Sequence, residues 1–256
     1  MCEHRIGMKI NSIDKAVKII EMLSENPRGL KLTEISNKLE INPSSAHHLL
    51  NTLLPHDYIA QDGDSKKYLL GFRFLEISRR IIDNLDIRSV ARRYLEALGR
   101  ETREAVHLVV LRGNKVVYID KIDKTGGLSL ATYIGFATDP HAAAGGKVLL
   151  AGLPDKKVKE IYQNRMLKNY GKKTITNMPM LLEELQKVRQ QGYAIDDEEY
   201  YEGVRCIAAP VRSGSHVVAS VSITGSVFTI TMDRIERELS EMVKKTADQI
   251  SAQLRW

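Results

Sequence analysis

The segment 43–54 constrains the fold of this chain more than any other, because its apolar residues recur at helical spacing on one side only. The stripe follows the i, i+3, i+4, i+7 pattern of an amphipathic helix and consists of Ala46, Leu49, Leu50 and Leu53. Asn42-Pro43 supplies an N-cap followed by proline at the first helical position. At about 100° per residue, the opposite face carries Ser44, His48 and Asn51, flanked by Ser45, His47 and Thr52. One apolar face for docking and one polar face for base edges are what a DNA recognition helix needs.

The elements around this segment predict a small DNA-binding domain. A helix near 13–23 ends at Asn26-Pro27, and a second helix begins at Thr33 as its N-cap. After segment 43–54, short strands at 58–60 and 67–70 bracket residues 61–66, which predicts a β-hairpin with an Asp-Gly turn. Such a hairpin is a wing, and it places Lys66 and Lys67 beside the groove to reach phosphates. The helix starts at Thr33 and Ser44 offer backbone amides to phosphates as well.

The rest of the chain changes from a helical to a strand period. A helix over 72–86 is expected to link the two parts. Strands are predicted at 105–111, 116–122, 207–211 and 217–224, and helices at 141–152, 155–163, 179–191 and 231–253. Strand pairs with helices segregated around them indicate an α+β fold with an antiparallel sheet. The predicted organisation is therefore a winged helix-turn-helix domain over 1–71 (helix-turn-helix about 32–54, wing about 57–70), a linker helix over 72–86 and a second domain over 87–256.

Composition excludes several classes of protein and leaves the partner open. Hydrophobic residues make up 43% and charged residues 27%, which is ordinary globular composition. No apolar run is long enough for a membrane span, and the first residues lack the apolar core of a secretory signal. Cys2 and Cys206 fit neither a metal site nor a disulfide framework, so we expect a cytoplasmic protein without metal or cofactor. The net charge is +6, but residues 1–85 hold 12 Lys and Arg against 11 Asp and Glu, so pattern rather than charge indicates DNA.

Five segments, taken together, resemble the IclR family (isocitrate lyase regulator type) of bacterial transcriptional regulators. They are the helix-turn-helix and wing residues 32–35, 44–53 and 68–71, Thr102-Arg103-Glu104-Ala105-Val106-His107-Leu108, the Pro140–Ala151 run, the Arg189–Glu199 run and the Gly203–Val211 run. The resemblance covers nearly the whole chain in order. It implies a DNA-binding regulator whose second domain is a GAF-like effector-binding domain. The chain departs from the family at His48, where arginine is usual, and at Glu40, where the turn usually has glycine.

The resemblance also implies which residues bind the effector. By position they are Leu128, Leu130, Ala144, Gly145, Asp196, Val204, Cys206, Ser222 and Thr224. Ser222 and Thr224 are two residues apart on a strand, so their hydroxyls share one face. Amides at the helix start near Ala144 suit a carboxylate, which favours a small carboxylic or sugar acid. The expected assembly is a homodimer, or a dimer of dimers, on a pseudo-palindromic operator of double-stranded DNA, with repression favoured over activation.

Two other functions remain open from the residues alone. One is a metabolite-binding module that acts through protein partners without binding DNA, because no Lys or Arg lies between Ile41 and His56. The other is an enzyme built on the second domain. Gly145-Gly146-Lys147-Val148 lacks the first glycine and the Ser/Thr of a phosphate-binding loop. A Cys206 nucleophile would need a histidine base, and the sequence places none beside it.

Overall fold

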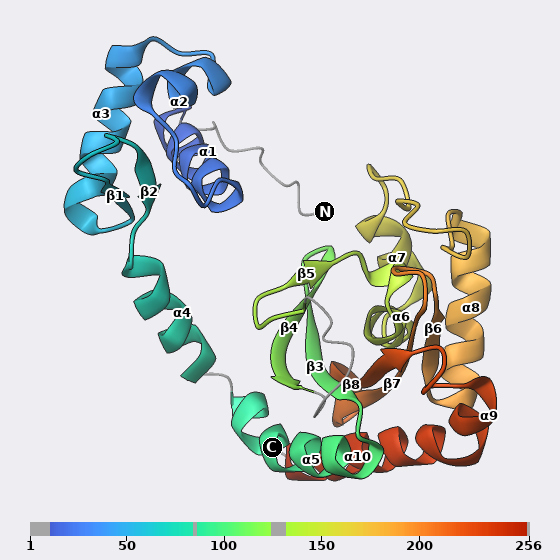
Figure 1. The fold of residues 1–256 in the computed structure, drawn as a ribbon. Coiled ribbons are helices and arrows are strands. Elements are labelled where there is room, and N and C mark those ends of the chain that lie inside the picture. Colours follow the sequence, from blue (N-terminus) through green and yellow to red (C-terminus); the bar gives the residue numbers. More distant parts are fainter. Residues whose placement is uncertain (1–10, 84–85, 124–131, 255–256) are drawn as a thin grey trace. The chain divides into compact units, whose positions relative to one another are not determined.

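The computed structural model describes residues 11–83, 86–123 and 132–254, and the chain divides into two compact units, Met1–Asn84 and Leu85–Trp256 (Figure 1). The division falls inside the segment 72–86 that the sequence predicts as a linker. In the described part of the chain, no helix is both long and apolar enough to cross a membrane.

The N-terminal unit is a winged helix-turn-helix, as predicted. Its elements are α1 (Asn11–Glu25), α2 (Leu32–Lys38), α3 (Pro43–Leu53), a 3₁₀ turn (Leu54–His56), β1 (Ile59–Gln61), β2 (Tyr68–Leu70) and α4 (Arg73–Asp83). Strands β1 and β2 pair antiparallel, and Leu30 adds a bridge to Tyr68. The helices and the hairpin share one core of buried side chains: Ile19, Leu23, Leu30, Ile35, Leu50, Ile59 and Tyr68. The apolar stripe of α3 packs into this core, which fixes the direction of its polar face.

Helix starts in this unit show where local sequence signals succeed and fail. The Asn42 side chain accepts a hydrogen bond from the Ser45 amide at 2.7 Å, so the predicted N-cap of α3 is confirmed. The predicted N-cap of α2 at Thr33 is wrong, because α2 begins at Leu32 and Lys31 is its N-cap. There the Glu34 carboxylate accepts a hydrogen bond from the backbone N–H of Lys31 at 2.7 Å. This bond satisfies the backbone donor of the N-cap residue, whose own side chain forms no cap.

The wing is the predicted hairpin. Strand β1 ends at Gln61 and β2 starts at Tyr68, and Asp62-Gly63 begins the loop over 62–67 between them. The Asp62 carboxylate accepts from the Ser65 amide at 2.8 Å and from its hydroxyl at 2.6 Å, and Lys66 takes the positive φ, 55°. An Asx-type turn of this kind holds the loop without glycine at its left-handed position. Glu40 likewise has φ 53° in the turn between α2 and α3, where the family usually has glycine.

The C-terminal unit is α+β with one six-stranded antiparallel sheet in the order β5-β4-β3-β8-β7-β6. Its strands are β3 (Ala105–Arg112), β4 (Lys115–Ile122), β5 (Ala137–Thr138), β6 (Ala194–Asp197), β7 (Val204–Ser213) and β8 (His216–Ser226). Its helices are α5 (Asp86–Thr102), α6 (Ala144–Ala151) after a 3₁₀ turn (Pro140–Ala142), α7 (Asp155–Ile161), α8 (Met178–Gln191), α9 (Met232–Arg234), a π-helical turn (Ile235–Leu239) and α10 (Ser240–Gln253). The predicted antiparallel sheet is confirmed, while β5 and β6 were not predicted.

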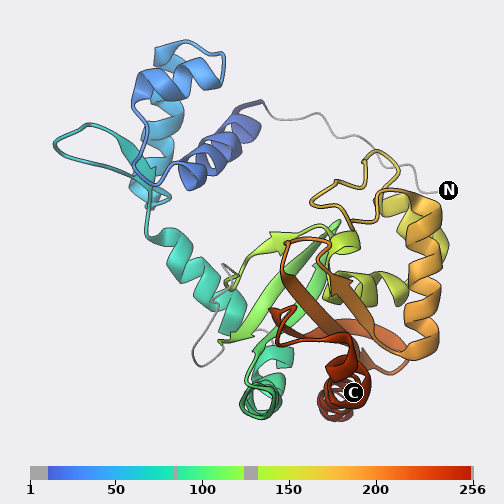
Figure 2. The same cartoon turned by 45° about the vertical axis from the view of Figure 1, so that its right-hand side comes forward.

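The two faces of this sheet have different helical covers (Figure 2). Helices α5 and α10 pack side by side on one face, where Leu95 and Val243 join the inward aliphatic residues of β3, β7 and β8. On the other face, α6 contacts β3, β7 and β8 and also packs against α8. This second face carries polar as well as apolar side chains, and it is where the predicted effector residues lie.

Candidate DNA-binding surface and effector cavity

The outward face of α3 presents the side chains that the sequence predicts. All six are exposed, while Ala46 and Leu50 on the opposite face are buried. The six are Ser44, Ser45, His47, His48, Asn51 and Thr52. Two of them are held by contacts within the helix: the Asn51 amide lies 3.3 Å from His47 Nδ1, and the Thr52 hydroxyl donates to the His48 carbonyl at 2.9 Å. Side chains held in one orientation recognise a base edge at a smaller entropic cost.

A groove beside α3 brings together predicted residues from three elements. It is lined by Lys31, Leu32, Thr33, His47, Gln61, Ser65, Lys66 and Tyr68. The start of α2, the recognition helix and the wing loop therefore meet at one place, where two lysines and an imidazole can face a phosphate. Lys67 lies next to the groove and is half-buried. Lys31 was not predicted to lie here, because the expected N-cap of α2, Thr33, lies two residues after the observed one.

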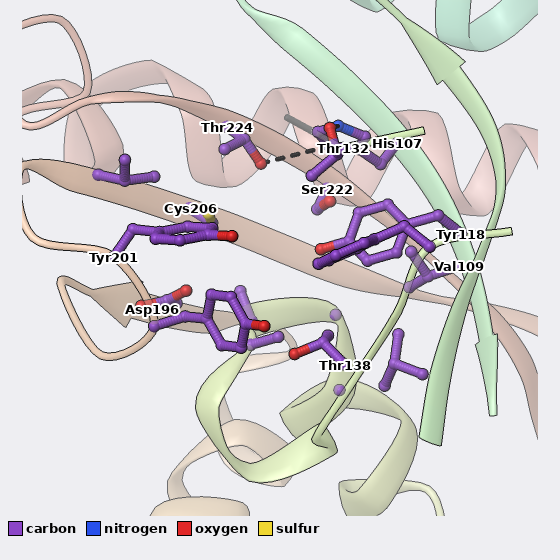
Figure 3. A pocket seen from close by; sticks show the side chains of 18 residues that line it. His107, Val109, Tyr118, Thr132, Thr138, Asp196, Tyr201, Cys206, Ser222 and Thr224 are labelled. Atoms are coloured by element: carbon purple, nitrogen blue, oxygen red, sulfur yellow. Dashed lines mark hydrogen bonds between the residues drawn. The ribbon is translucent and has the colours of Figure 1, made fainter. Parts of the chain in front are cut away.

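The C-terminal unit holds a cavity on the α6 side of the sheet (Figure 3). The predicted effector residues that the structure describes all line it: Ala144, Gly145, Asp196, Val204, Cys206, Ser222 and Thr224. Leu128 and Leu130 lie outside the described residues. The cavity volume is about 40 Å³. Since roughly 10–15 Å³ is needed for one water, the cavity has room for about three waters, which a small ligand could replace.

Strand register explains why these side chains meet. Asp196 on β6 pairs with Cys206 on β7, and Cys206 pairs with Thr224 on β8. Two residues along β8, Ser222 pairs with His107 on β3. Paired residues of an antiparallel sheet point to the same face, so these two neighbouring rungs place polar side chains from four strands on one face.

The start of α6 closes the other side of the cavity. Residues 143–146 line it, and no side chain caps the helix at Ala143. A Cβ at Gly145 would lie 2.7 Å from Val109 Cγ2, and one at Gly146 would lie 2.2 Å from the Pro140 carbonyl oxygen. Glycine at 145 therefore lets the start of α6 approach β3, and glycine at 146 lets the helix pack against the preceding 3₁₀ turn. The cavity consequently has amide donors on one side and hydroxyls on the other.

Burial keeps the titratable groups of the cavity largely uncharged. Burial lowers the pKa of His107 to about 3, so the imidazole is neutral; its Nε2 lies 3.0 Å from Thr132 Oγ1 and its Nδ1 3.4 Å from Thr224 Oγ1. Burial raises the pKa of Asp196 to about 7 and the pKa of the Cys206 thiol well above its usual range. A neutral thiol and a weakly basic imidazole in one cavity argue against a Cys206 nucleophile.

The cavity also has lining residues that were not predicted to bind the effector, although three of them (His107, Ala143 and Gly146) lie within the family segments. The unpredicted lining residues are His107, Val109, Val116, Tyr118, Thr132, Phe136, Thr138, Ala143, Gly146, Tyr200 and Tyr201. Alternation along β3 places His107 and Val109 on one face, but it does not say that this face binds a ligand. Thr138 is buried, and its hydroxyl has no hydrogen-bond partner among the described residues, which leaves a polar group for a bound molecule.

Comparison with known proteins agrees with this arrangement. Residues 12–63 match the IclR helix-turn-helix domain, and residues 79–252 match the family described as bacterial transcriptional regulator IclR C-terminal. The HTH-type transcriptional regulator KdgR of Escherichia coli is 36% identical over 247 residues, 96% of this chain and 93% of KdgR. The chain belongs to the IclR family. It is therefore a DNA-binding transcriptional regulator, and the predicted family membership is confirmed.

Two further relatives show the range of the similarity. The crystal structure of the Thermotoga maritima IclR has a TM-score of 0.76 and 32% identity, covering 96% of this chain and 99% of that one. The HTH-type transcriptional repressor AllR of Salmonella typhi is 28% identical over 95% of this chain and 89% of AllR. The similarity thus includes both units of the IclR fold.

Proposed function

We propose that this IclR-family regulator represses transcription from a pseudo-palindromic operator and that a small organic acid in the effector cavity controls its DNA binding. The observation that carries the proposal is the cavity itself, where the uncapped start of α6 faces the hydroxyls of Ser222 and Thr224. Helix-terminal amides and hydroxyls bind a carboxylate through directed hydrogen bonds and the helix dipole. Repression is supported by the similarity to AllR, which is named a repressor.

A homodimer, or a pair of dimers, is supported by apolar residues that one copy leaves exposed. On α1, Ile13 and Val17 are 59% and 47% exposed, and near α4, Phe72, Leu75 and Ile81 are 82%, 64% and 60% exposed. Apolar side chains exposed along a helix suit contact with a second copy. Two copies related by a two-fold axis would insert two α3 helices in successive major grooves of a palindrome.

Fluorescence anisotropy of labelled DNA tests the proposal. The probe is the region upstream of the operon that encodes the protein, titrated with full-length protein with and without a panel of carboxylic and sugar acids. We expect specific binding that one acid weakens by about 5- to 150-fold, the usual range of allosteric coupling. A protein that binds an acid in a thermal-shift assay but binds none of these fragments would instead be a metabolite-binding module acting through protein partners. Turnover of an acid in a steady-state assay would support the enzyme alternative.

A further inference from the structure

The effector cavity contains an acidic side chain without a counter-ion. Asp196 is 4% exposed, and within the described residues it forms no ion pair. The three acidic residues that follow it are each paired: Asp197 with Arg205 and Lys173, Glu198 with Lys173, and Glu199 with Lys147. None of the described residues lining the cavity is Lys or Arg. A buried acid among groups that carry no positive charge is stable mainly when it is protonated.

The groups on the sheet that face Asp196 carry no positive charge. On β7 the Cys206 thiol is neutral, since burial raises its pKa, and on β4 burial also raises the pKa of Tyr118. On β3, His107 is a neutral imidazole with a pKa of about 3. On β8, Thr224 contributes a hydroxyl. The sheet side of the cavity therefore keeps the same charge between pH 6 and 9.

The loop and helix neighbours of Asp196 are already engaged. The Glu199 amide donates to Asp196 Oδ1 at 2.9 Å. On α6, the Lys147 ammonium donates to the Ile195 carbonyl at 2.8 Å and to Glu184 of α8 at 3.1 Å, and it pairs with the Glu199 carboxylate. Tyr200 and Tyr201 complete the wall. Lys147 is thus neutralised by two carboxylates before any effector enters.

We propose that Asp196 selects the charge of the effector: the cavity accepts a singly charged organic acid only with one proton bound to Asp196. The inference rests on the proposed function, because the carboxylate of the acid would occupy the amides at the start of α6. An ionised Asp196 in the same small cavity would repel the carboxylate of the acid, whereas a protonated Asp196 donates its O–H to the ligand. The other polar lining groups are hydroxyls, a thiol and an imidazole, which suit hydroxyl or keto groups on the ligand.

This arrangement predicts that the affinity for the acid falls as the pH rises. Simple carboxylic acids are ionised throughout pH 6–9, so the ligand does not titrate there. With an Asp196 pKa of about 7, affinity is nearly constant below that pH and falls about tenfold per pH unit above it. Between pH 6 and 9 the dissociation constant should rise by roughly ninety-fold.

Isothermal titration calorimetry of the full-length protein tests this with lactate, glycerate and gluconate as probes, at pH 6 to 9 in two buffers of different ionisation enthalpy. The wild type should take up about one proton at pH 8. The Asp196→Asn variant keeps an acceptor for the Glu199 amide. It should bind the acid as tightly as wild type does at pH 6, and its affinity should not change with pH. Glu202→Gln, on the same loop but exposed, should keep the wild-type slope.

The outcomes separate this inference from the proposed function. An acid that binds equally at pH 6 and 9 without proton uptake overturns the role of Asp196 and leaves the organic-acid effector intact. Failure of every acid at pH 6, with binding of an uncharged polyol such as sorbitol or of no probe, overturns the organic-acid effector and this inference together. If Asp196→Asn does not fold, the buffer dependence of the wild-type heat still decides the question.

Discussion

Replacing Lys147 with methionine should destabilise the C-terminal unit more than most single changes. The side chain is 1% exposed and its ammonium pairs with Glu199, so Lys147→Met leaves a buried carboxylate without its cation. Breaking a buried pair by removing one partner costs about 3–5 kcal/mol. For a unit spanning residues 85–256, this corresponds to a fall in melting temperature of roughly 6–20 °C.

The effect should depend on pH with a defined sign. Burial already raises the pKa of Glu199 above its usual 4.5, and loss of the Lys147 ammonium raises it further. An acid whose pKa is higher in the folded state stabilises that state below the unfolded pKa and loses this contribution as the pH rises. Lys147→Met should therefore be closest to wild type near pH 5 and most destabilised near pH 8.

Urea and thermal unfolding, followed by circular dichroism of the full chain at both pH values, measure this effect. Lys157→Met is the matched control, because Lys157 is 65% exposed and its pair with Glu160 should contribute less than about 1 kcal/mol. Adding Glu199→Gln to Lys147→Met removes the orphaned charge and should recover part of the loss. A deficit below about 1 kcal/mol at pH 8, or one that is the same at pH 5, would refute the reasoning.

Three further predictions follow from the two sites. Asn51→Ala should weaken specific operator binding by about 1–3 kcal/mol in anisotropy without changing effector affinity, and a wild-type footprint would refute the recognition face. Ser222→Ala should weaken effector binding by about 1 kcal/mol in calorimetry and leave DNA affinity without effector unchanged; identical heats would contradict the cavity assignment. Gly145→Val should cost about 1–3 kcal/mol in urea unfolding, because its Cβ meets Val109 at 2.7 Å, whereas Gly63→Ala, in open space, should cost little.

The sequence by itself determined the features that depend on local period. The stripe of Ala46 and Leu50 against the polar face of Ser44 and Asn51 predicts the orientation of α3, because helical spacing alone decides which side chains share a face. Alternation similarly places Ser222 and Thr224 together on β8. The resemblance to the family then supplied the predicted effector residues, which local period does not indicate.

Only the tertiary structure decided how distant segments meet. The groove beside α3 exists because the start of α2, the recognition helix and the wing loop meet there. His107 and Thr138 enter the cavity through strand pairing and loop packing, and neither carries a local signal of it. The charge state of Asp196 depends on its burial among neutral groups, which is set by contacts between residues far apart in the chain. Local periodicity fixes the direction of a side chain, whereas its environment comes from long-range packing.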